Sequence, residues 1–347
     1  MTMAAIYVRE QGTLITKSGE RLAIVKGGRK LLERPIAGID GVALFGNVQI
    51  TSQALSMLLE HGIDVSYFSY SGKYIGHSAA DSSKNIFLRL RQYDFYLDID
   101  KRMDMARVIV ANKIRNQITL IENHRWKSPY DWTSDVKELE RHLIKLSDKD
   151  SANSLMGIEG VCSSIYFRSY AQMFTGEFQF EKRTRRPPRN PINVILSLGY
   201  TLLTKEVTGA LEAESFETHL GFLHGIRYGR KSLGLDIVEE FRQPVIDRLV
   251  LKLFNKGMIT KYDFEFLEEG VVNLTEEGFR HFCTAYERWM NGSDTTSGDK
   301  SFRSRLREQT AKLKRAIQYG EEYVPYTQNR NEKSEQEAGK DPHEMRM

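Results

Sequence analysis

Hydrophobic positions divide the chain into a first part with short alternating runs and a longer second part with helical spacing. Up to about residue 80, short runs rich in β-branched residues are separated by Gly or charged turns, which is typical of β-strands. These runs are Ile6–Val8, Thr13–Thr16, Leu22–Val25, Val42–Phe45, Val48–Ile50, Val65–Phe68 and Lys73–Ile75. One helix is predicted among them, with Ser52 as its N-cap and Gly62 at its end.

From Asn85 to about Met290, apolar residues recur at intervals of three and four, which predicts helices. The expected helical segments are 106–121, 134–146, one opening at Ser154, 193–213, 235–253 and 275–290. Beyond Tyr326 the chain lacks apolar residues, so we expect disorder there. The predicted fold is α+β: a small N-terminal β-rich domain (1–82), a larger all-α catalytic domain (83–325) and a disordered tail (326–347).

Composition narrows the class of protein only slightly. A length of 347 residues allows two domains, and a net charge of +4 means that affinity for a polyanion must come from local basic clusters. Two cysteines are too few for a disulfide framework or a thiolate metal site. Charges appear early in the chain, and no apolar run reaches the length of a membrane span. We therefore expect a cytoplasmic protein without a secretory signal.

Glu159 is the only charged residue between Asp150 and Arg168, within a segment that reads as a buried helix. An unpaired ionised acid in an apolar interior is very costly, so this carboxylate needs a partner. Gly157 and Gly160 flank it, and such small residues allow either a ligand or another helix to come close. The sequence favours neither reading over the other.

Partners for Glu159 are available in two later segments. If 235–242 is helical, Asp236, Glu239 and Glu240 fall within an arc of roughly 100°. His224 precedes this segment, and the intervening glycines permit a turn that folds it back. Taken alone, the acidic face is more simply a solvated surface, and a lone histidine more simply a hydrogen-bonding residue. Combined with the isolated Glu159, they predict a site of one imidazole and two or three carboxylate oxygens. Such donors suit Mn²⁺ or Mg²⁺.

Two basic clusters flank these residues in sequence. The first contains Lys182, Arg183, Arg185, Arg186 and Arg189, with two prolines that favour an exposed loop; the second contains Arg227, Arg230 and Lys231. Arginines beside a catalytic metal suit a groove that follows a phosphate backbone. A third cluster, from Arg303 to Arg315, is interpreted as a solvated helix face.

Several separated motifs resemble the CRISPR-associated integrase-endonuclease of the adaptation module, the Cas-one family. They are Leu155–Gly160, Arg185–Asn193 with Leu198–Tyr200, Gly221–His224, Leu235–Arg242, Leu44–Thr51 and Ala111–Gln117. Together they span the chain from about Ala5 to Tyr323, and the variant most resembles subtype I-C.

The resemblance implies an N-terminal domain that mediates homodimerisation and a helical domain that holds the metal. It places the metal ligands on Glu159, His224 and Glu239 and gives Asp236 a supporting catalytic role, while Glu240 is assigned to the helix surface. The implied partners are double-stranded DNA (the prespacer and the CRISPR repeat) and a small dimeric Cas-two protein that bridges two dimers. The implied reaction joins the 3′-hydroxyl of a short foreign DNA to the repeat by transesterification.

Two other functions need many of the same residues. A metal-dependent phosphoesterase for a small substrate would use the same ligands in a closed pocket, with little need for Arg183–Arg189. A non-catalytic nucleic-acid-binding scaffold would keep the basic loops but tolerate loss of Glu159.

Overall fold

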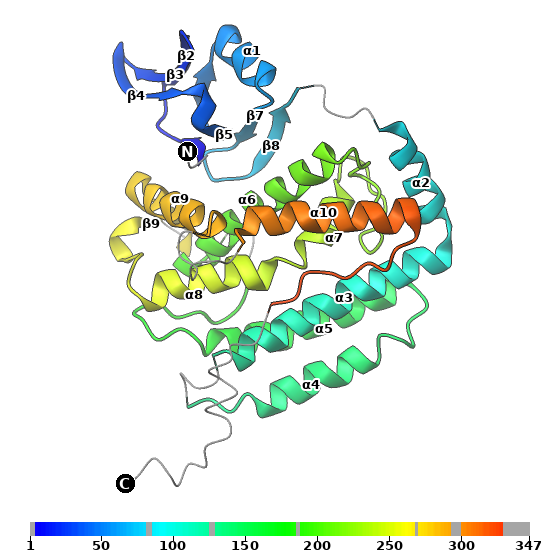
Figure 1. Ribbon diagram of the computed structural model, residues 1–347. Coiled ribbons are helices and arrows are strands. Elements are labelled where there is room, and N and C mark those ends of the chain that lie inside the picture. The colour runs from blue at the N-terminus through cyan, green and yellow to red at the C-terminus, as the bar shows by residue number, and fades with distance from the viewer. Residues whose placement is uncertain are drawn as a thin grey trace.

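The computed structural model describes residues 4–80, 85–124, 129–184, 188–267, 270–292 and 300–328. Two four-stranded sheets form its N-terminal part, and a larger set of helices forms the rest (Figure 1). The architecture is α+β, as the sequence predicted. The predicted domain boundary at residue 82 lies outside the described residues.

The N-terminal sheets sandwich a small core of their own. One sheet has the order β1–β5–β7–β8 and the other β4–β3–β2–β6. Leu22, Leu44, Leu58 and Val65 are among its buried residues. The strands are β1 (Ala4–Val8), β2 (Thr13–Ser18), β3 (Arg21–Lys26), β4 (Arg29–Pro35), β5 (Ile39–Phe45), β6 (Val48–Ile50), β7 (Asp64–Phe68) and β8 (Tyr74–Ser78). The sequence pattern missed β4, whose residues are mostly charged and exposed.

Helix α1 (Ser52–Glu60) packs against β2 of one sheet and β7 of the other. Its N-cap is Thr51, whose hydroxyl accepts a hydrogen bond from the Ala54 N–H at 3.2 Å, one residue before the predicted cap. Both Thr and Ser can cap a helix, so the pattern alone could not choose between these neighbours.

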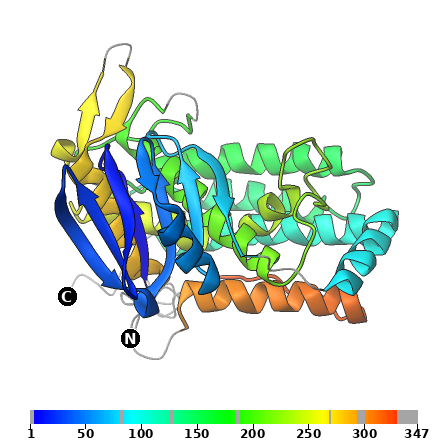
Figure 2. The ribbon, with the colours of Figure 1, turned by 90° about the horizontal axis from the view of Figure 1, so that it is seen from above.

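The remaining helices pack around one large core. They are α2 (Ile86–Leu97), α3 (Ile99–Glu122), α4 (Thr133–Ile144), α5 (Ala152–Ala171), α6 (Pro191–Ala213), α7 (Ser232–Val238), α8 (Arg248–Asn255), α9 (Glu276–Met290) and α10 (Phe302–Tyr319). This part is not purely helical. A short hairpin, β9 (Phe264–Phe266) and β10 (Val272–Leu274), projects from it, as Figure 2 shows in yellow.

Two details complete the picture of the helical part. Cys162 and Cys283 are both free and buried, as expected for small core residues. None of the described helices combines the length and apolarity needed to cross a membrane.

The C-terminal segment Glu321–Gln328, which we call the strap, runs from the end of α10 along α3 (Figure 1). Its last residues are bonded: the Tyr326 carbonyl accepts from Asn112 at 2.8 Å, and the Gln328 N–H donates to Asn116 at 2.9 Å. The predicted disordered tail therefore does not begin at Tyr326, because buried asparagines on α3 hold these backbone groups. Residues 329–347 lie outside the described part of the chain.

Candidate active site

Helix α5 carries Glu159 on a half-buried face, and its carboxylate is paired as predicted. Glu159 Oε1 accepts hydrogen bonds from Lys113 Nζ on α3 and from Ser163 Oγ, the latter at 2.8 Å. The Lys113 side chain is only 6 % exposed. Lys113, to which no sequence pattern gave a role, is the partner that Glu159 required.

The space beside Glu159 is open. A Cβ added at Gly157 or Gly160 would meet no atom within 4 Å, so neither glycine serves close helix packing. A hollow of about 960 Å³ begins here, and its lining includes Glu159, Ser163, Arg168, Lys182 and Arg183. Of the two readings of the small residues, this geometry favours room for a ligand.

Hydrogen bonds to Asp236 fix the position of His224, the second predicted ligand. Asp236 is fully buried and accepts from the backbone N–H groups of Phe222, Leu223 and His224 at 2.5, 3.0 and 2.9 Å. Its Oδ1 also lies 2.7 Å from His224 Nδ1. A carboxylate accepts hydrogen bonds, so Nδ1–H is the donor, and in the neutral imidazole this tautomer leaves the lone pair on Nε2. An imidazole oriented in this way is suited to bind a metal through Nε2.

The turn that carries His224 requires two segments of the backbone to lie unusually close together. A Cβ at Gly221 would lie 2.7 Å from the His224 carbonyl oxygen and equally close to the Ser232 Cβ. Gly229 has φ of +68°, in the left-handed region that favours glycine. The predicted folding of His224 back onto the acidic segment is therefore what the structure contains.

The predicted helix 235–253 is broken. Helix α7 ends at Val238, a turn follows, and a π-helix at Arg242–Asp247 leads into α8. Pro244 has no N–H to donate to the carbonyl of Glu240, four residues earlier. Asn116 Nδ2 donates to that carbonyl instead, at 3.0 Å. Pro244 was the sequence signal for the break.

Glu239 caps the end of α7 and faces α3. Its Oε2 lies 2.7 Å from Lys113 Nζ and its Oε1 lies 3.3 Å from Arg242 Nη2. Burial alone would raise the pKa of Glu239, but the Arg242 and Lys113 cations more than offset it and lower this pKa to about 2. Glu239 is therefore ionised at neutral pH, as a metal ligand must be.

Glu240 is not on a solvated surface, so that assignment was wrong. It is fully buried and accepts from Tyr323 Oη at 2.5 Å and from the Tyr326 N–H at 2.9 Å. Burial raises the pKa of Glu240 to about 7 despite these donors. The break after Val238 lets Glu239 meet α3 while Glu240 meets the strap.

The donors present fit a divalent ion, although they do not yet surround one. Among the described residues, no three His, Cys, Asp or Glu side chains are grouped as a metal cage. However, Glu239 Oε2 is buried and makes no directed hydrogen bond, despite its closeness to the Lys113 ammonium. Hard carboxylate oxygens with a single imidazole nitrogen suit Mn²⁺ or Mg²⁺.

The predicted DNA-binding residues differ in how exposed their side chains are to solvent. Arg183 is half-buried and donates to Asn193 Oδ1 at 2.8 Å and to Ser197 Oγ at 3.0 Å. Arg189 and Arg227 are exposed. Arg185 and Arg186 lie outside the described residues.

In the second cluster, local bonds fix two of the cations. Arg230 Nη2 donates to the Gly225 carbonyl at 2.6 Å, and Lys231 pairs with Glu212. Arg230 and Lys231 therefore also stabilise the turn that carries His224. Lys182, the first residue of the first basic cluster, and Arg168 also line the hollow beside Glu159; Arg168 was missed because it stands alone, outside both basic clusters.

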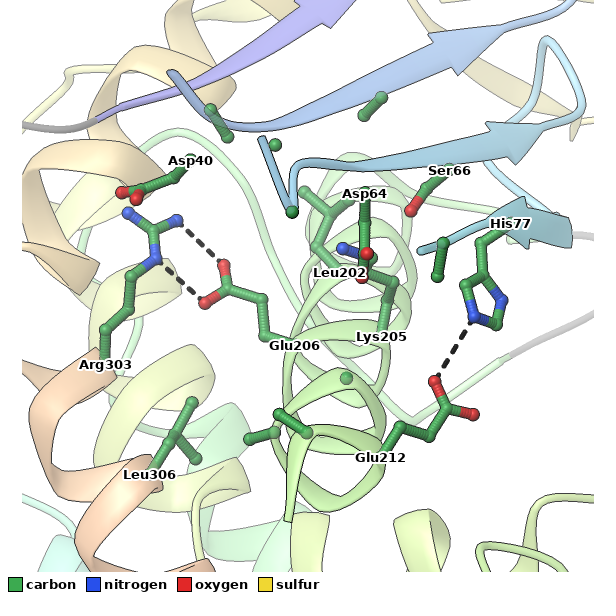
Figure 3. Close-up of a pocket in the computed structure, with 18 of the residues that line it drawn as sticks. Asp40, Asp64, Ser66, His77, Leu202, Lys205, Glu206, Glu212, Arg303 and Leu306 are labelled. Atoms are coloured by element: carbon green, nitrogen blue, oxygen red, sulfur yellow. Dashed lines mark hydrogen bonds and ion pairs between the residues drawn. The ribbon is translucent and has the colours of Figure 1, made fainter. Parts of the chain in front are cut away.

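A second hollow, of about 920 Å³, lies between the N-terminal sheet and helices α6 and α10 (Figure 3). Arg303 projects toward it and pairs with Glu206 at 2.9 Å, while His77 lies 3.3 Å from Glu212. Arg303 is the first residue of the third basic cluster, which was interpreted as a solvated helix face. Its side chain is only 12 % exposed, so that interpretation was wrong for Arg303. None of the predicted ligands lines this hollow.

A comparison with protein families decides the identity of the chain. The model of the family described as CRISPR associated protein Cas1 matches residues 6–288. The chain belongs to the Cas1 family. Cas1 proteins are the endonucleases and integrases of CRISPR adaptation, and membership implies the use of a divalent metal ion.

Individual relatives agree with this membership. The chain is 33 % identical over 291 residues to CRISPR-associated endonuclease Cas1 3 of Thermus thermophilus, covering 83 % of this chain and 85 % of the relative. A solved CAS1 protein from Thermotoga maritima superposes with a TM-score of 0.80 at 27 % identity, covering 94 % of this chain and 100 % of that one. A chain of a Cas6-RT-Cas1–Cas2 complex gives a TM-score of 0.79 at 25 % identity, covering 95 % of this chain and 36 % of that one.

Proposed function

We propose that this Cas1 family member joins the 3′-hydroxyl ends of short foreign DNA to a CRISPR repeat at the site of Glu159, His224 and Glu239. One observation carries the proposal. Lys113 on α3 pairs with both Glu159 on α5 and Glu239 at the end of α7, and Glu159 lines an open hollow. Glu159, Glu239 and His224 Nε2 would hold Mn²⁺ or Mg²⁺. The ion would polarise the target phosphodiester and favour ionisation of the attacking hydroxyl.

The residues around these ligands have separate roles in the proposal. Asp236 fixes the tautomer and orientation of His224, and Ser163 orients Glu159. Arg242 pairs with the second oxygen of Glu239 and limits how that carboxylate can turn. The reaction exchanges one phosphodiester for another, since the repeat strand leaves with a free 3′-hydroxyl, and it needs no nucleotide energy source.

The DNA backbone is proposed to follow the hollow along α5. Lys182 and Arg183 line it, and the exposed Arg189 and Arg227 extend its positive charge. We assign Arg185, Arg186, Arg230 and Lys231 to the same DNA contact. Neutralising phosphates with such cations supplies affinity that falls as salt rises.

The partners follow from the family and its relatives. A relative was solved in a complex that contains Cas2. We propose that this chain forms a homodimer through its N-terminal sheets, and that a Cas2 dimer bridges two such dimers. The substrates are the incoming duplex and the repeat in the chromosome, which places the protein in the cytoplasm. Subtype I-C remains a prediction.

Strand transfer tests this function directly. Purified protein with Cas2 is mixed with a labelled short duplex and a supercoiled plasmid bearing the repeat, with Mn²⁺, with Mg²⁺ or with chelator. We expect metal-dependent joining that falls by about 10³-fold or more in Glu159→Gln and in His224→Ala. Glu308→Gln, an exposed carboxylate on α10 paired with Lys300, is the matched control and should join normally.

The other outcomes separate the alternatives. Joining that survives both site variants would mean that the ligands are wrongly assigned. Tight DNA binding without any joining would favour the scaffold function. Hydrolysis of small phosphoesters without DNA affinity would favour the phosphoesterase.

A further inference from the structure

The ammonium group of Lys113 lies between the two carboxylates that the proposed function assigns to the metal. Lys113 Nζ bonds to Glu159 Oε1 and lies 2.7 Å from Glu239 Oε2. Its side chain is 6 % exposed, and it extends from the buried face of α3. This charge is therefore shielded from solvent and interacts with both carboxylates.

The two acids need a positive charge near them. Two carboxylates that share a site repel each other, and a cation that contacts both offsets this repulsion. Of the two acids, Arg242 lies within ion-pair distance of Glu239, and Ser163 offers Glu159 only a neutral donor. In the part of the chain that the structure describes, Lys113 is the cation that contacts both carboxylates.

Lys113 contacts one oxygen of each acid, Glu159 Oε1 and Glu239 Oε2. A divalent ion between the two acids would bind the same oxygens at about 2.0–2.2 Å and would repel an ammonium bound to them. The ion and the ammonium cannot both occupy this position. The flexible four-carbon stem of lysine allows the ammonium to move away without a shift of α3.

We propose that Lys113 is an internal cation that holds Glu159 and Glu239 together before metal binds, and that the incoming ion displaces its ammonium from them. The inference rests on the proposed function, in which both acids are metal ligands. Lys113 is then a positioning residue with two opposed effects: it stabilises the metal-free protein and weakens metal binding.

Metal binding without DNA or turnover tests this role. Mn²⁺ is titrated into wild type and Lys113→Met, followed by calorimetry and by the electron paramagnetic resonance signal of free Mn²⁺, and Tm is measured in chelator and in Mn²⁺. In Lys113→Met we expect a lower Tm in chelator, a Kd for Mn²⁺ that falls about tenfold or more, and a larger rise of Tm on adding Mn²⁺. A merely structural lysine would lower Tm without tightening Mn²⁺ binding.

Lys314→Met is the matched control. It removes an ammonium that lies 2.8 Å from a Glu214 carboxylate oxygen, outside the proposed site. Its Mn²⁺ affinity should equal that of wild type. If Lys113→Met does not fold, Lys113→Gln removes the charge but keeps two donors for the acids. A Lys113→Gln protein that folds only when Mn²⁺ is added supports displacement, and one that stays unfolded with Mn²⁺ overturns it.

Glu159→Gln separates failure of this inference from failure of the proposed function. If Glu159→Gln abolishes Mn²⁺ binding but Lys113→Met binds no more tightly than wild type, the metal site stands and the role of Lys113 is overturned. If Mn²⁺ binding is unaffected by Glu159→Gln, the metal site itself is wrongly placed and both proposals fall.

Discussion

Asp236 acts as the organising residue of the His224 turn. Three backbone N–H groups and one imidazole N–H donate to its buried carboxylate. Hydrogen bonds to an ionised acceptor are stronger than neutral ones, and four of them offset the cost of burying this charge. The orientation of a metal-binding histidine therefore depends on an acid that need not touch the metal.

Asp236→Asn tests this dependence at the residue scale. An amide presents an NH₂ group to at least one of the donors, so we expect His224 to lose its fixed orientation. Mn²⁺ affinity should fall by about 10–100-fold. Calorimetry measures this fall, and circular dichroism checks that the helices are retained. An unchanged Mn²⁺ affinity in a folded variant would show that Asp236 does not position His224.

The raised pKa of the buried Asp247 predicts that the free energy of unfolding depends on pH. Burial raises the pKa of Asp247 to about 6, although Tyr166 and Tyr200 donate to it. Because this pKa is above that of the unfolded chain, about 3.9, the folded protein binds more protons between these values. The contribution to stability is therefore fully present below about pH 4 and is lost as pH rises through 6.

Asp247→Asn isolates this contribution. The free energy of unfolding of wild type minus that of the variant should fall by about 3 kcal/mol between pH 4 and pH 7. Denaturant unfolding at several pH values measures it. A difference that stays level across this range, or that rises with pH, would contradict the assignment.

At the scale of elements, the break after α7 and the strap form one unit. Tyr323 and the Tyr326 backbone bind Glu240, and the Tyr326 ring stacks on Phe241 with centroids 5.2 Å apart. The strap thus covers the side of the turn opposite to Glu239. Its contacts hold in place the segment from which Glu239 reaches the site.

Two truncations test the strap. Ending the chain after Glu322 removes Tyr323 and Tyr326 and leaves the buried Glu240 carboxylate without these donors. We expect a loss of about 3–5 kcal/mol in unfolding free energy, with weaker Mn²⁺ binding. Ending it after Gln328 retains every strap contact described above and is the matched control. Equal stability of the two truncated proteins would show that the strap does not support the turn.

At the scale of the whole molecule, Glu287 on α9 joins the N-terminal sheet to the helices. Glu287 accepts from Tyr7 Oη at 2.7 Å and from Arg303 Nη2 on α10, also at 2.7 Å. Arg303 pairs in addition with Glu206 on α6. Phe45 adds apolar contact, with its ring 4.8 Å from that of Phe279. One charged network therefore connects β1 to three helices.

Glu287→Gln should weaken this connection. The amide turns a donor toward Arg303 and removes one of its two counter-charges, for an expected loss of about 2–4 kcal/mol. Thermal unfolding measures the loss. Glu277→Gln is the control on the same helix: its pair with Arg280 is half-exposed or more on both sides, so the change should be within about 1 kcal/mol. Equal effects of the two variants would contradict the role of Glu287.

The local sequence pattern was sufficient to predict most helices and strands, because hydrophobic periodicity and capping residues act within one element. The N-terminal strands except β4, the helices α3 to α6 and α9, and the need of Glu159 for a partner all followed from neighbouring residues. The fold of His224 onto Asp236 was foreseen from the intervening glycines. Pro244 carried the signal for the break in the acidic helix, and that signal was not used.

Only tertiary structure decided which acid meets which partner. Glu239 and Glu240 are adjacent in sequence, yet one faces Lys113 on α3 and the other faces Tyr323 in the strap. Lys113 lies 46 residues from Glu159, and no periodicity relates the two. Pairing of charges between elements depends on how helices pack, because the energy of a buried ion depends on contacts that the local sequence does not contain.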